Sequence, residues 1–310
     1  MLRRITLFLV TAVLLSVAYA APASAEGARI DHIDRLSDRV DVVYVYSPSM
    51  NRVIPNRVVH PVGGQRAPTF YLLTGAGGGE DGISWFDNTD VVGFFSNKNV
   101  NVVMPVGGRF SMYTDWQADD PILGRNQWTT YLTRELPGVI DNHYDTTRVN
   151  AISGVSMSAG PALDLAIQAP SLYRAVGSYS GCARSSDVVG VLNTAAVVTR
   201  GGGNIVNMWG VPGGGSWAAH DPWLRAGELR GKAIYISAAS GLPGPIDGPL
   251  VVPSPVEAVA DGCTASMASR LSELGIPATY VRRSEGAHTW GLFTADLYNS
   301  WPMIAGAIGA

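Results

Sequence analysis

Short apolar runs alternate along most of the chain with longer stretches that carry apolar residues at helical spacing. An uninterrupted short apolar run is typical of a strand that is buried on both faces in a parallel sheet. Apolar residues three and four positions apart are typical of a helix that packs one face on such a sheet. The predicted buried strands are residues 68–73, 100–105, 149–153, 173–179, 232–238 and 278–282. The predicted helices are residues 89–97, 128–143, 159–169, 254–274 and 290–308, the last of them broken near Pro302.

This order of elements predicts an α/β protein with a mostly parallel sheet and helices on both of its faces. Residues 39–46 and 56–60 precede the first buried run and are predicted to form two antiparallel strands. Residues 187–223 interrupt the alternation, because they are rich in glycine and show no regular spacing. We expect an irregular insertion or lid there, with Trp209 and Trp217 either facing a cleft or packed beneath it.

The amino-terminal segment has the composition of an export signal. Arg3 and Arg4 precede an apolar run, and the tripeptide Ala23-Ser24-Ala25 matches a signal-peptidase cleavage site. We therefore expect residues 1–25 to be a signal peptide that is removed on secretion, with no transmembrane span afterwards. Residues 26–310 are then expected to form a single α/β domain.

Charge and cysteine content add two constraints. The net charge of −3 argues against nucleic acid as a partner. The chain has two cysteines, Cys182 and Cys263, and an exported protein meets oxidising conditions. They are therefore either joined in a disulfide or buried apart from each other.

Residues 148–170 combine a short buried strand, a tight turn at Gly154-Val155-Ser156-Met157-Ser158 and a helix that ends before Pro170. The α/β-hydrolases hold their nucleophilic serine in this strand–turn–helix arrangement, with the pattern G-x-S-x-G. Free N–H groups at the start of the helix can donate hydrogen bonds to a developing oxyanion. Ser158 departs from the pattern, which has glycine there, so the segment also fits a loop in which Ser156 caps the helix. Ser156 is the candidate nucleophile.

A serine nucleophile needs a histidine as base and a carboxylate that orients the histidine. In α/β-hydrolases the order along the chain is serine, acid and histidine, with the histidine after the last strand. His288 has this position. Asp247 and Glu257 both follow the preceding strand, and the pattern alone does not choose between them. Glu257 also has a structural explanation, because it completes a helix capping box with Ser254.

Nine short segments spread over most of the chain carry a family resemblance. They are SPSMNR at 47–52, YLLTG at 71–75, VVMPVGG at 102–108, YTDW at 113–116, YLTRELP at 131–137, GVSM at 154–157, MWG at 208–210, HDP at 220–222 and HTW at 288–290. In these segments the chain resembles the mycolyltransferases of the antigen 85 type and their corynebacterial relatives. The resemblance implies an α/β-hydrolase fold and an activity that uses no metal and no cofactor.

The resemblance also implies roles for residues that the pattern leaves open. The acid of this family is a glutamate early in a helix, which favours Glu257 over Asp247. The family tolerates a residue other than glycine where Ser158 stands. Its oxyanion donors correspond to the backbone N–H groups of Ala76 and Met157.

Of the positions that the resemblance implies bind substrate, two differ from the family and one is kept. The family's sugar-binding subsite has an aspartate and an arginine where this chain has Thr74 and Gly77, so a carboxylate and a cationic donor are missing. The tryptophan of the H-x-W motif is kept as Trp290. The pair Cys182 and Cys263 resembles that of the corynebacterial branch.

The activity implied by the resemblance is transfer of a mycolyl, or long-chain fatty acyl, group in the cell envelope. The donor is a glycolipid, trehalose monomycolate, and the acceptor is a sugar hydroxyl of trehalose monomycolate or arabinogalactan. The acyl group is carried on Ser156, with His288 and Glu257 completing a catalytic triad. Two alternatives stay open: a secreted carboxylesterase with the same triad and water as acceptor, and a catalytically silent cell-wall binding protein on this fold.

Overall fold

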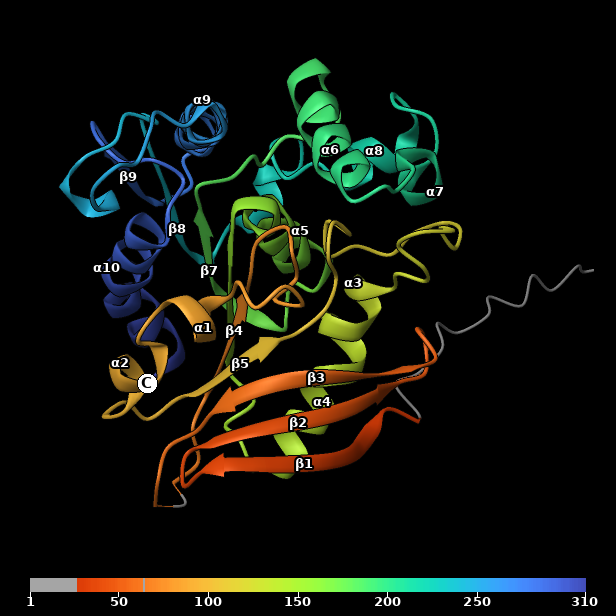
Figure 1. The fold of residues 1–310 in the computed structure, drawn as a ribbon, viewed down its shortest axis with the longest axis vertical. Helices are drawn as coiled ribbons and strands as arrows, with labels where there is room; N and C mark the ends of the chain where they lie inside the picture. Colours follow the sequence, from red (N-terminus) through yellow and green to blue (C-terminus); the bar gives the residue numbers. More distant parts are fainter. Residues whose placement is uncertain (1–26, 64) are drawn as a thin grey trace, which may run out of the picture.

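The computed structural model describes residues 27–63 and 65–310, so the signal peptide predicted at residues 1–25 lies outside the described residues. Within them, one nine-stranded sheet has the order β1-β2-β3-β5-β4-β6-β7-β8-β9 (Figure 1). The strands are β1 (Arg29–Ser37), β2 (Val40–Ser47), β3 (Arg52–Val59), β4 (Thr69–Leu73), β5 (Asn101–Pro105), β6 (Asn150–Val155), β7 (Tyr173–Tyr179), β8 (Ala233–Ala239) and β9 (Thr279–Arg283).

The sheet has an antiparallel part and a parallel part. Strands β1, β2 and β3 pair antiparallel in sequence order, and β3 also pairs antiparallel with β5. From β5 across to β9, all neighbouring strands are parallel. Every predicted buried run forms one of these parallel strands, which confirms the predicted α/β class. Their carboxyl ends therefore meet along one edge of the sheet, where open α/β sheets place their ligands.

Helices cover both faces of the sheet, as predicted. The helices are α1 (Trp85–Asn88), α2 (Val91–Phe95), α3 (Trp128–Thr130), α4 (Leu136–His143), α5 (Ala159–Gln168), α6 (Val188–Arg200), α7 (Ile205–Trp209), α8 (Gly215–Ala219), α9 (Pro255–Glu273) and α10 (Trp290–Ile308). A π-helical segment, η1 (Tyr131–Glu135), joins α3 to α4, and the 3-10 turns are η2 (Ser156–Ser158), η3 (Ala226–Leu229) and η4 (Pro245–Asp247). In the described part of the chain, no helix is both long enough and apolar enough to cross a lipid bilayer.

Strand β4 shows how the sheet separates two apolar cores. Tyr71 and Leu73 point to the face that α3, α4, α5 and α9 cover. Phe70 and Leu72 point to the opposite face, where α1, α2 and α10 pack (Figure 1). All four side chains are at most 1% exposed. A strand buried on both faces has no polar face, and for this reason it reads as an uninterrupted apolar run in the sequence.

The first strand, β1, is not predicted from the sequence pattern. It forms an edge of the sheet, and most of its side chains are exposed. Only Ile30 and Ile33 pack against the apolar core, so neither an apolar run nor a regular alternation marks the strand. Charged residues along an exposed edge strand discourage pairing with other chains.

The insertion at residues 187–223 is present, but it is helical rather than irregular, because α6, α7 and α8 lie in it (Figure 1). Asp187 and Asn204 cap the first two of these helices by accepting backbone N–H hydrogen bonds. The spacing of α6 is obscured because apolar residues such as Leu192 lie on its exposed face as well as on its buried one. Trp209 and Trp217 are buried and pack edge to face, with ring centroids 5.2 Å apart.

The break predicted at Pro302 does not occur, because α10 runs through this residue without interruption. Pro302 lies on the exposed side of the helix, where water can satisfy the carbonyl group that loses its N–H partner. Leu297 and Ile304, on either side of the proline, are fully buried in the same core. Tertiary packing therefore holds both halves of the helix in line.

A buried ion pair joins α10 to the last strand. Asp296 of α10 is fully buried and pairs with the guanidinium group of Arg283. Burial raises the pKa of Asp296 to about 6, and the positive charge of Arg283 offsets only part of this effect. The unfolded chain therefore releases this proton at a lower pH than the folded protein does.

We expect Asp296 to lower the free energy of unfolding as the pH rises from about 4 to about 6. In this range the folded protein still holds the proton, and each unit of pKa difference corresponds to about 1.4 kcal/mol. Relative to an Asp296→Asn variant, wild type should lose about 3 kcal/mol over this range in denaturant titrations. Parallel pH curves for the two proteins would contradict the raised pKa.

Candidate active site

Ser156 stands on the tight turn between β6 and α5, at the carboxyl end of a central strand. Its backbone is left-handed, with a φ of +56°, and its side chain is partly exposed. Two close approaches require glycine. A Cβ atom on Gly154 would lie 2.1 Å from the carbonyl oxygen of Ser158, and one on Gly181 would lie 2.4 Å from the carbonyl oxygen of Ser156. The strand–turn–helix arrangement predicted around Ser156 is present.

Ser158 replaces the last glycine of the turn pattern without disturbing the turn, because its side chain points inward. Its hydroxyl is fully buried and accepts a hydrogen bond from the N–H of Val155 at 2.8 Å. The same hydroxyl donates to the carbonyl oxygen of Val155 at 3.0 Å or of Leu73 at 3.3 Å. A small hydrogen-bonding side chain is therefore compatible with this position.

Three side chains from distant parts of the sequence form a hydrogen-bonded chain at the turn. Ser156 Oγ lies 2.8 Å from His288 Nε2, and His288 Nδ1 lies 2.7 Å from Glu257 Oε2. His288 is 19% exposed and lies between β9 and α10, whereas Glu257 lies in the first turn of α9 and is fully buried. Asp247, the other acid that the pattern left open, contacts the neighbours of His288 but not its ring.

The buried carboxylate of Glu257 has hydrogen-bond donors for both oxygens. Oε1 accepts from the N–H of Ala239 at 2.8 Å and from the hydroxyl of Ser180 at 2.9 Å, and Oε2 faces His288. The capping box is only half formed, because Ser254 accepts from the Glu257 N–H at 3.2 Å while the Glu257 side chain turns to His288. Nothing in the sequence pattern singles out Ser180, since a serine after a strand is common in any loop.

The backbone N–H groups of Ala76 and Met157, the predicted oxyanion donors, belong to two segments that meet near Ser156. The loop after β4 passes so close that a Cβ atom on Gly75 would lie 3.6 Å from Ser156 Cβ. In that loop, the carbonyl of Ala76 accepts from the Phe110 N–H at 2.8 Å, while the Ala76 N–H has no acceptor among the described residues. Met157 lies in the first helical turn, where N–H groups have no partner within the helix. Met157 is therefore the sequence neighbour of the candidate nucleophile, and Ala76 directly follows a glycine that approaches it closely.

A small uncharged cleft of about 40 Å³ opens beside Ser156. Asn193 and Val197 of α6 line one side, and Val256 and Ala260 of α9 line the other. The floor consists of Ser156, Met157, Ser180, Gly181 and Cys182. No charged side chain of the described residues lines it, so this space is compatible with the first part of an apolar group attached to the atom that Ser156 attacks, but it is too small to enclose a long chain.

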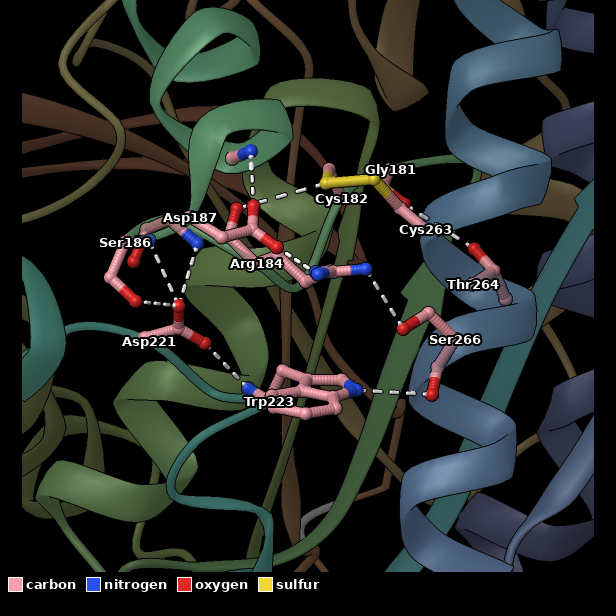
Figure 2. The surroundings of a disulfide bond; sticks show 12 residues. Gly181, Cys182, Arg184, Ser186, Asp187, Asp221, Trp223, Cys263, Thr264 and Ser266 are labelled. Atoms are coloured by element: carbon pink, nitrogen blue, oxygen red, sulfur yellow. Dashed lines mark hydrogen bonds and ion pairs between the residues drawn. A yellow bond between two sulfur atoms is a disulfide. The ribbon is translucent and has the colours of Figure 1, made fainter.

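A disulfide joins Cys182 to Cys263, with an S–S distance of 2.08 Å. It links the segment after β7 to α9, the helix that carries Glu257 (Figure 2). Side-chain hydrogen bonds connect the same two regions, as Figure 2 shows: Thr264 to the Gly181 carbonyl at 3.3 Å, Arg184 to the Ser266 hydroxyl at 3.2 Å, and Trp223 to the Ser266 carbonyl at 3.2 Å. The helix is therefore fixed to the floor of the cleft by covalent and polar contacts.

The residues predicted to bind sugar do not line this cleft. Thr74 is only 3% exposed, and its buried hydroxyl has no partner among the described residues. At Gly77, the carboxylate of Asp81 fills the space of a side chain, since an added Cβ atom would lie 1.9 Å from Asp81 Oδ2. Trp290 packs edge to face against Trp85, with ring centroids 5.2 Å apart.

Comparisons with known proteins identify relatives of this chain. The profile of a family described as "Putative esterase" matches residues 47–303. The chain is 30% identical over 281 residues to the "Diacylglycerol acyltransferase/mycolyltransferase Ag85A" of Mycobacterium tuberculosis, covering 87% of this chain and 82% of that protein. It is also 30% identical to the Ag85B protein of Mycobacterium leprae, covering 87% of this chain and 85% of that protein.

Two solved structures illustrate the shared fold. The crystal structure of Mycobacterium tuberculosis MPT51 (FbpC1) matches with a TM-score of 0.75 and 25% identity, over 88% of this chain and 100% of that chain. An S-formylglutathione hydrolase from Agrobacterium tumefaciens matches with a TM-score of 0.64 and 16% identity, over 91% of this chain and 100% of that chain. This second likeness concerns the fold alone.

We expect reduction of the disulfide to destabilise the protein. The bridge closes a loop with a sequence separation of 81 residues, for which chain entropy predicts a loss of about 4 kcal/mol. Denaturant titrations of wild type and of a Cys182→Ser/Cys263→Ser variant measure this loss. Two reactive thiols in the denatured, unreduced wild type would contradict the bridge itself.

Proposed function

The chain belongs to the antigen 85-type branch of the esterase family, and from this membership we propose that it is a secreted mycolyltransferase. It would move a mycolyl, or similar long-chain acyl, group from trehalose monomycolate to a sugar hydroxyl. The observation that carries the proposal is the hydrogen-bonded chain Ser156–His288–Glu257 beside an uncharged cleft. Relatives that are 30% identical are named as acyltransferases and mycolyltransferases.

In the first half-reaction, His288 Nε2 takes the proton of the Ser156 hydroxyl while Oγ attacks the ester carbonyl of the donor. The carbonyl oxygen becomes an oxyanion that accepts hydrogen bonds from the N–H groups of Ala76 and Met157. When the intermediate collapses, the bond to the trehalose oxygen breaks, and His288 returns the proton to that oxygen. Trehalose leaves, and the acyl group stays on Ser156 with the start of its chain beside the cleft.

In the second half-reaction, a sugar hydroxyl takes the place of trehalose. His288 removes its proton, the new alkoxide attacks the acyl-enzyme, and the ester bond to Ser156 breaks. The proton held by His288 returns to Ser156 Oγ, so the enzyme ends in its starting state. These steps use only groups of this chain and its substrates, so the proposed reaction needs no metal or cofactor.

Glu257 is proposed to hold His288 in the tautomer that this cycle needs. With the proton on Nδ1, the ring donates to Glu257 and accepts from the Ser156 hydroxyl. When His288 gains the second proton, the negative charge of Glu257 stabilises the imidazolium at 2.7 Å. Ala239 and Ser180 keep the carboxylate in place through its other oxygen.

The proposed site of action is the cell envelope. Residues 1–25 have the composition of a signal peptide, and the disulfide suits an oxidising compartment. The donor and the acceptor are envelope glycolipids or polysaccharides, so export brings the enzyme to both substrates.

We predict that Ser156→Ala abolishes turnover of trehalose monomycolate, because it removes only the attacking hydroxyl. His288→Ala should cost a similar amount, since the members of a triad act as a unit. Glu257→Gln keeps the shape of the side chain but loses its charge, and should lower the rate by about four orders of magnitude. Mass spectrometry of the products, with and without added trehalose, measures these losses.

Asp261→Asn is the matched control on the same helix, because Asp261 pairs with Arg282 and not with His288. It should keep the wild-type rate. Free mycolic acid as the sole product from wild type would favour a carboxylesterase. Failure of wild type to consume the donor or to react with a fluorophosphonate probe would favour a catalytically silent binding protein.

We also predict weak affinity for free trehalose, because Thr74 is buried and Gly77 has no side chain. Thr74→Asp with Gly77→Arg would restore the family's charged pair and should lower the KM for trehalose by about tenfold, the worth of one charge-assisted hydrogen bond. The Asp81 carboxylate occupies the space of the new side chain at position 77 and must rotate away. The double variant is therefore also made with Asp81→Ser, which removes this obstruction. Wild-type saturation at the trehalose concentration that an Ag85A enzyme needs in a parallel assay would contradict this prediction.

A further inference from the structure

The loop that carries His288 is supported by another loop, residues 240–249, which follows β8. Three backbone hydrogen bonds join them: the N–H of Ser240 donates to Arg283 O at 3.1 Å, that of Gly241 to Gly286 O at 3.0 Å, and that of Gly286 to Leu242 O at 2.6 Å. These contacts hold the amino-terminal side of the His288 loop, before the histidine itself.

The side chain of Asp247 holds the histidine segment from both sides. Asp247 Oδ1 accepts from the N–H of Ala287 at 2.9 Å and from the hydroxyl of Thr289 at 2.6 Å. These donors belong to the residues immediately before and after His288. Asp247 Oδ2 accepts from the N–H of Gly244 at 2.8 Å, which anchors the carboxylate in its own loop.

Backbone packing fixes the distance between the two loops. A Cβ atom on Gly291, in the first turn of α10, would lie 2.0 Å from the carbonyl oxygen of Ile246. The backbone next to Asp247 therefore packs in direct contact with the start of α10. A glycine is required at this close approach, and the Asp247 carboxylate is held within reach of the residues around His288.

The same segment also reaches Glu257. The N–H of Ser254 donates to the carbonyl of Gly241 at 2.8 Å, and the hydroxyl of Ser254 accepts from the N–H of Glu257 at 3.2 Å. One stretch of chain, from β8 to the first turn of α9, thus contacts both the loop of His288 and the helix end of Glu257. It therefore connects the segment that carries the His288 ring with the helix turn that carries the Glu257 carboxylate.

We propose that Asp247 is a positioning residue for the reaction, acting through His288. Its carboxylate fixes the segment Ala287–Thr289. His288 Nδ1 then keeps its hydrogen bond to Glu257, while Nε2 exchanges protons first with Ser156 and then with the acceptor hydroxyl. The proposal rests on the proposed function, because it concerns the proton transfers assigned to His288. A displacement of about 1 Å at a catalytic group can lower a rate by about 100-fold, so a few hydrogen bonds to its neighbours have a measurable effect.

The test measures the rate of Ser156 labelling by a fluorophosphonate probe, together with kcat and KM for a soluble short-chain p-nitrophenyl ester. Asp247→Ala should lower kcat and the labelling rate by about 100-fold with little change in KM. Thr289→Val, which removes one donor, should lower them by about tenfold. Thr289→Ser keeps a hydroxyl and should recover most of the rate lost in Thr289→Val.

A double-mutant cycle separates positioning from general destabilisation. If Asp247 acts through Thr289, adding Thr289→Val to Asp247→Ala should cause almost no further loss. Asp120→Asn is the matched control, since the Asp120 carboxylate also accepts several loop hydrogen bonds, and its donors among the described residues are Ile122, Leu123, Asn204 and Asn207. It should lower the melting temperature without lowering the labelling rate.

Labelling of folded Asp247→Ala at the wild-type rate, or a fully additive double variant, would overturn the proposal while leaving the proposed function intact. If Asp247→Ala does not fold, the Thr289→Val and Thr289→Ser pair decides in the same way, because a rate equal to wild type in Thr289→Val overturns the proposal. Wild type that is never labelled and never turns over ester would instead overturn the proposed function.

Discussion

The geometry of the site depends on one buried negative charge. Glu257 is fully buried, and an ionised carboxylate is unstable there unless it is hydrogen-bonded. Its three donors come from three places: Ser180 just after β7, Ala239 at the end of β8, and His288 after β9. The carboxylate can be satisfied only when these neighbouring parallel strands and α9 are in register. The hydrogen bonds of the site therefore require the sheet and α9 to be in their final arrangement.

Much of the fold could be predicted, because burial on both faces makes a parallel strand visible as an apolar run. The elements that escaped prediction lack such a simple signal. Strand β1 is an exposed edge, and α6 has apolar residues on its exposed face as well as its buried one. At Pro302, packing of the helix on both sides outweighs a local preference for a break. In each case tertiary contacts, rather than local composition, decide the structure.

Prediction of the site was strongest where the chemistry needs one residue type in one local setting. The turn around Ser156 and the histidine after the last strand meet that condition. The choice between Asp247 and Glu257 did not follow from spacing, because it depends on how two loops pack against each other. The structure places both carboxylates near His288, one on its ring and one on its neighbours. The role of Ser180 could not be predicted from the sequence, because it depends on the hydrogen bond to Glu257 that forms only in the folded protein.

The left-handed backbone at Ser156 has an evolutionary consequence. A residue other than glycine in this conformation costs about 1–3 kcal/mol relative to a relaxed backbone. Glycine would remove that cost together with the hydroxyl, so selection for stability and selection for chemistry oppose each other at this position. A lineage that no longer needed the hydroxyl would become more stable by drifting to glycine there. Stability alone therefore does not explain a serine in this conformation, whereas a function of its hydroxyl does.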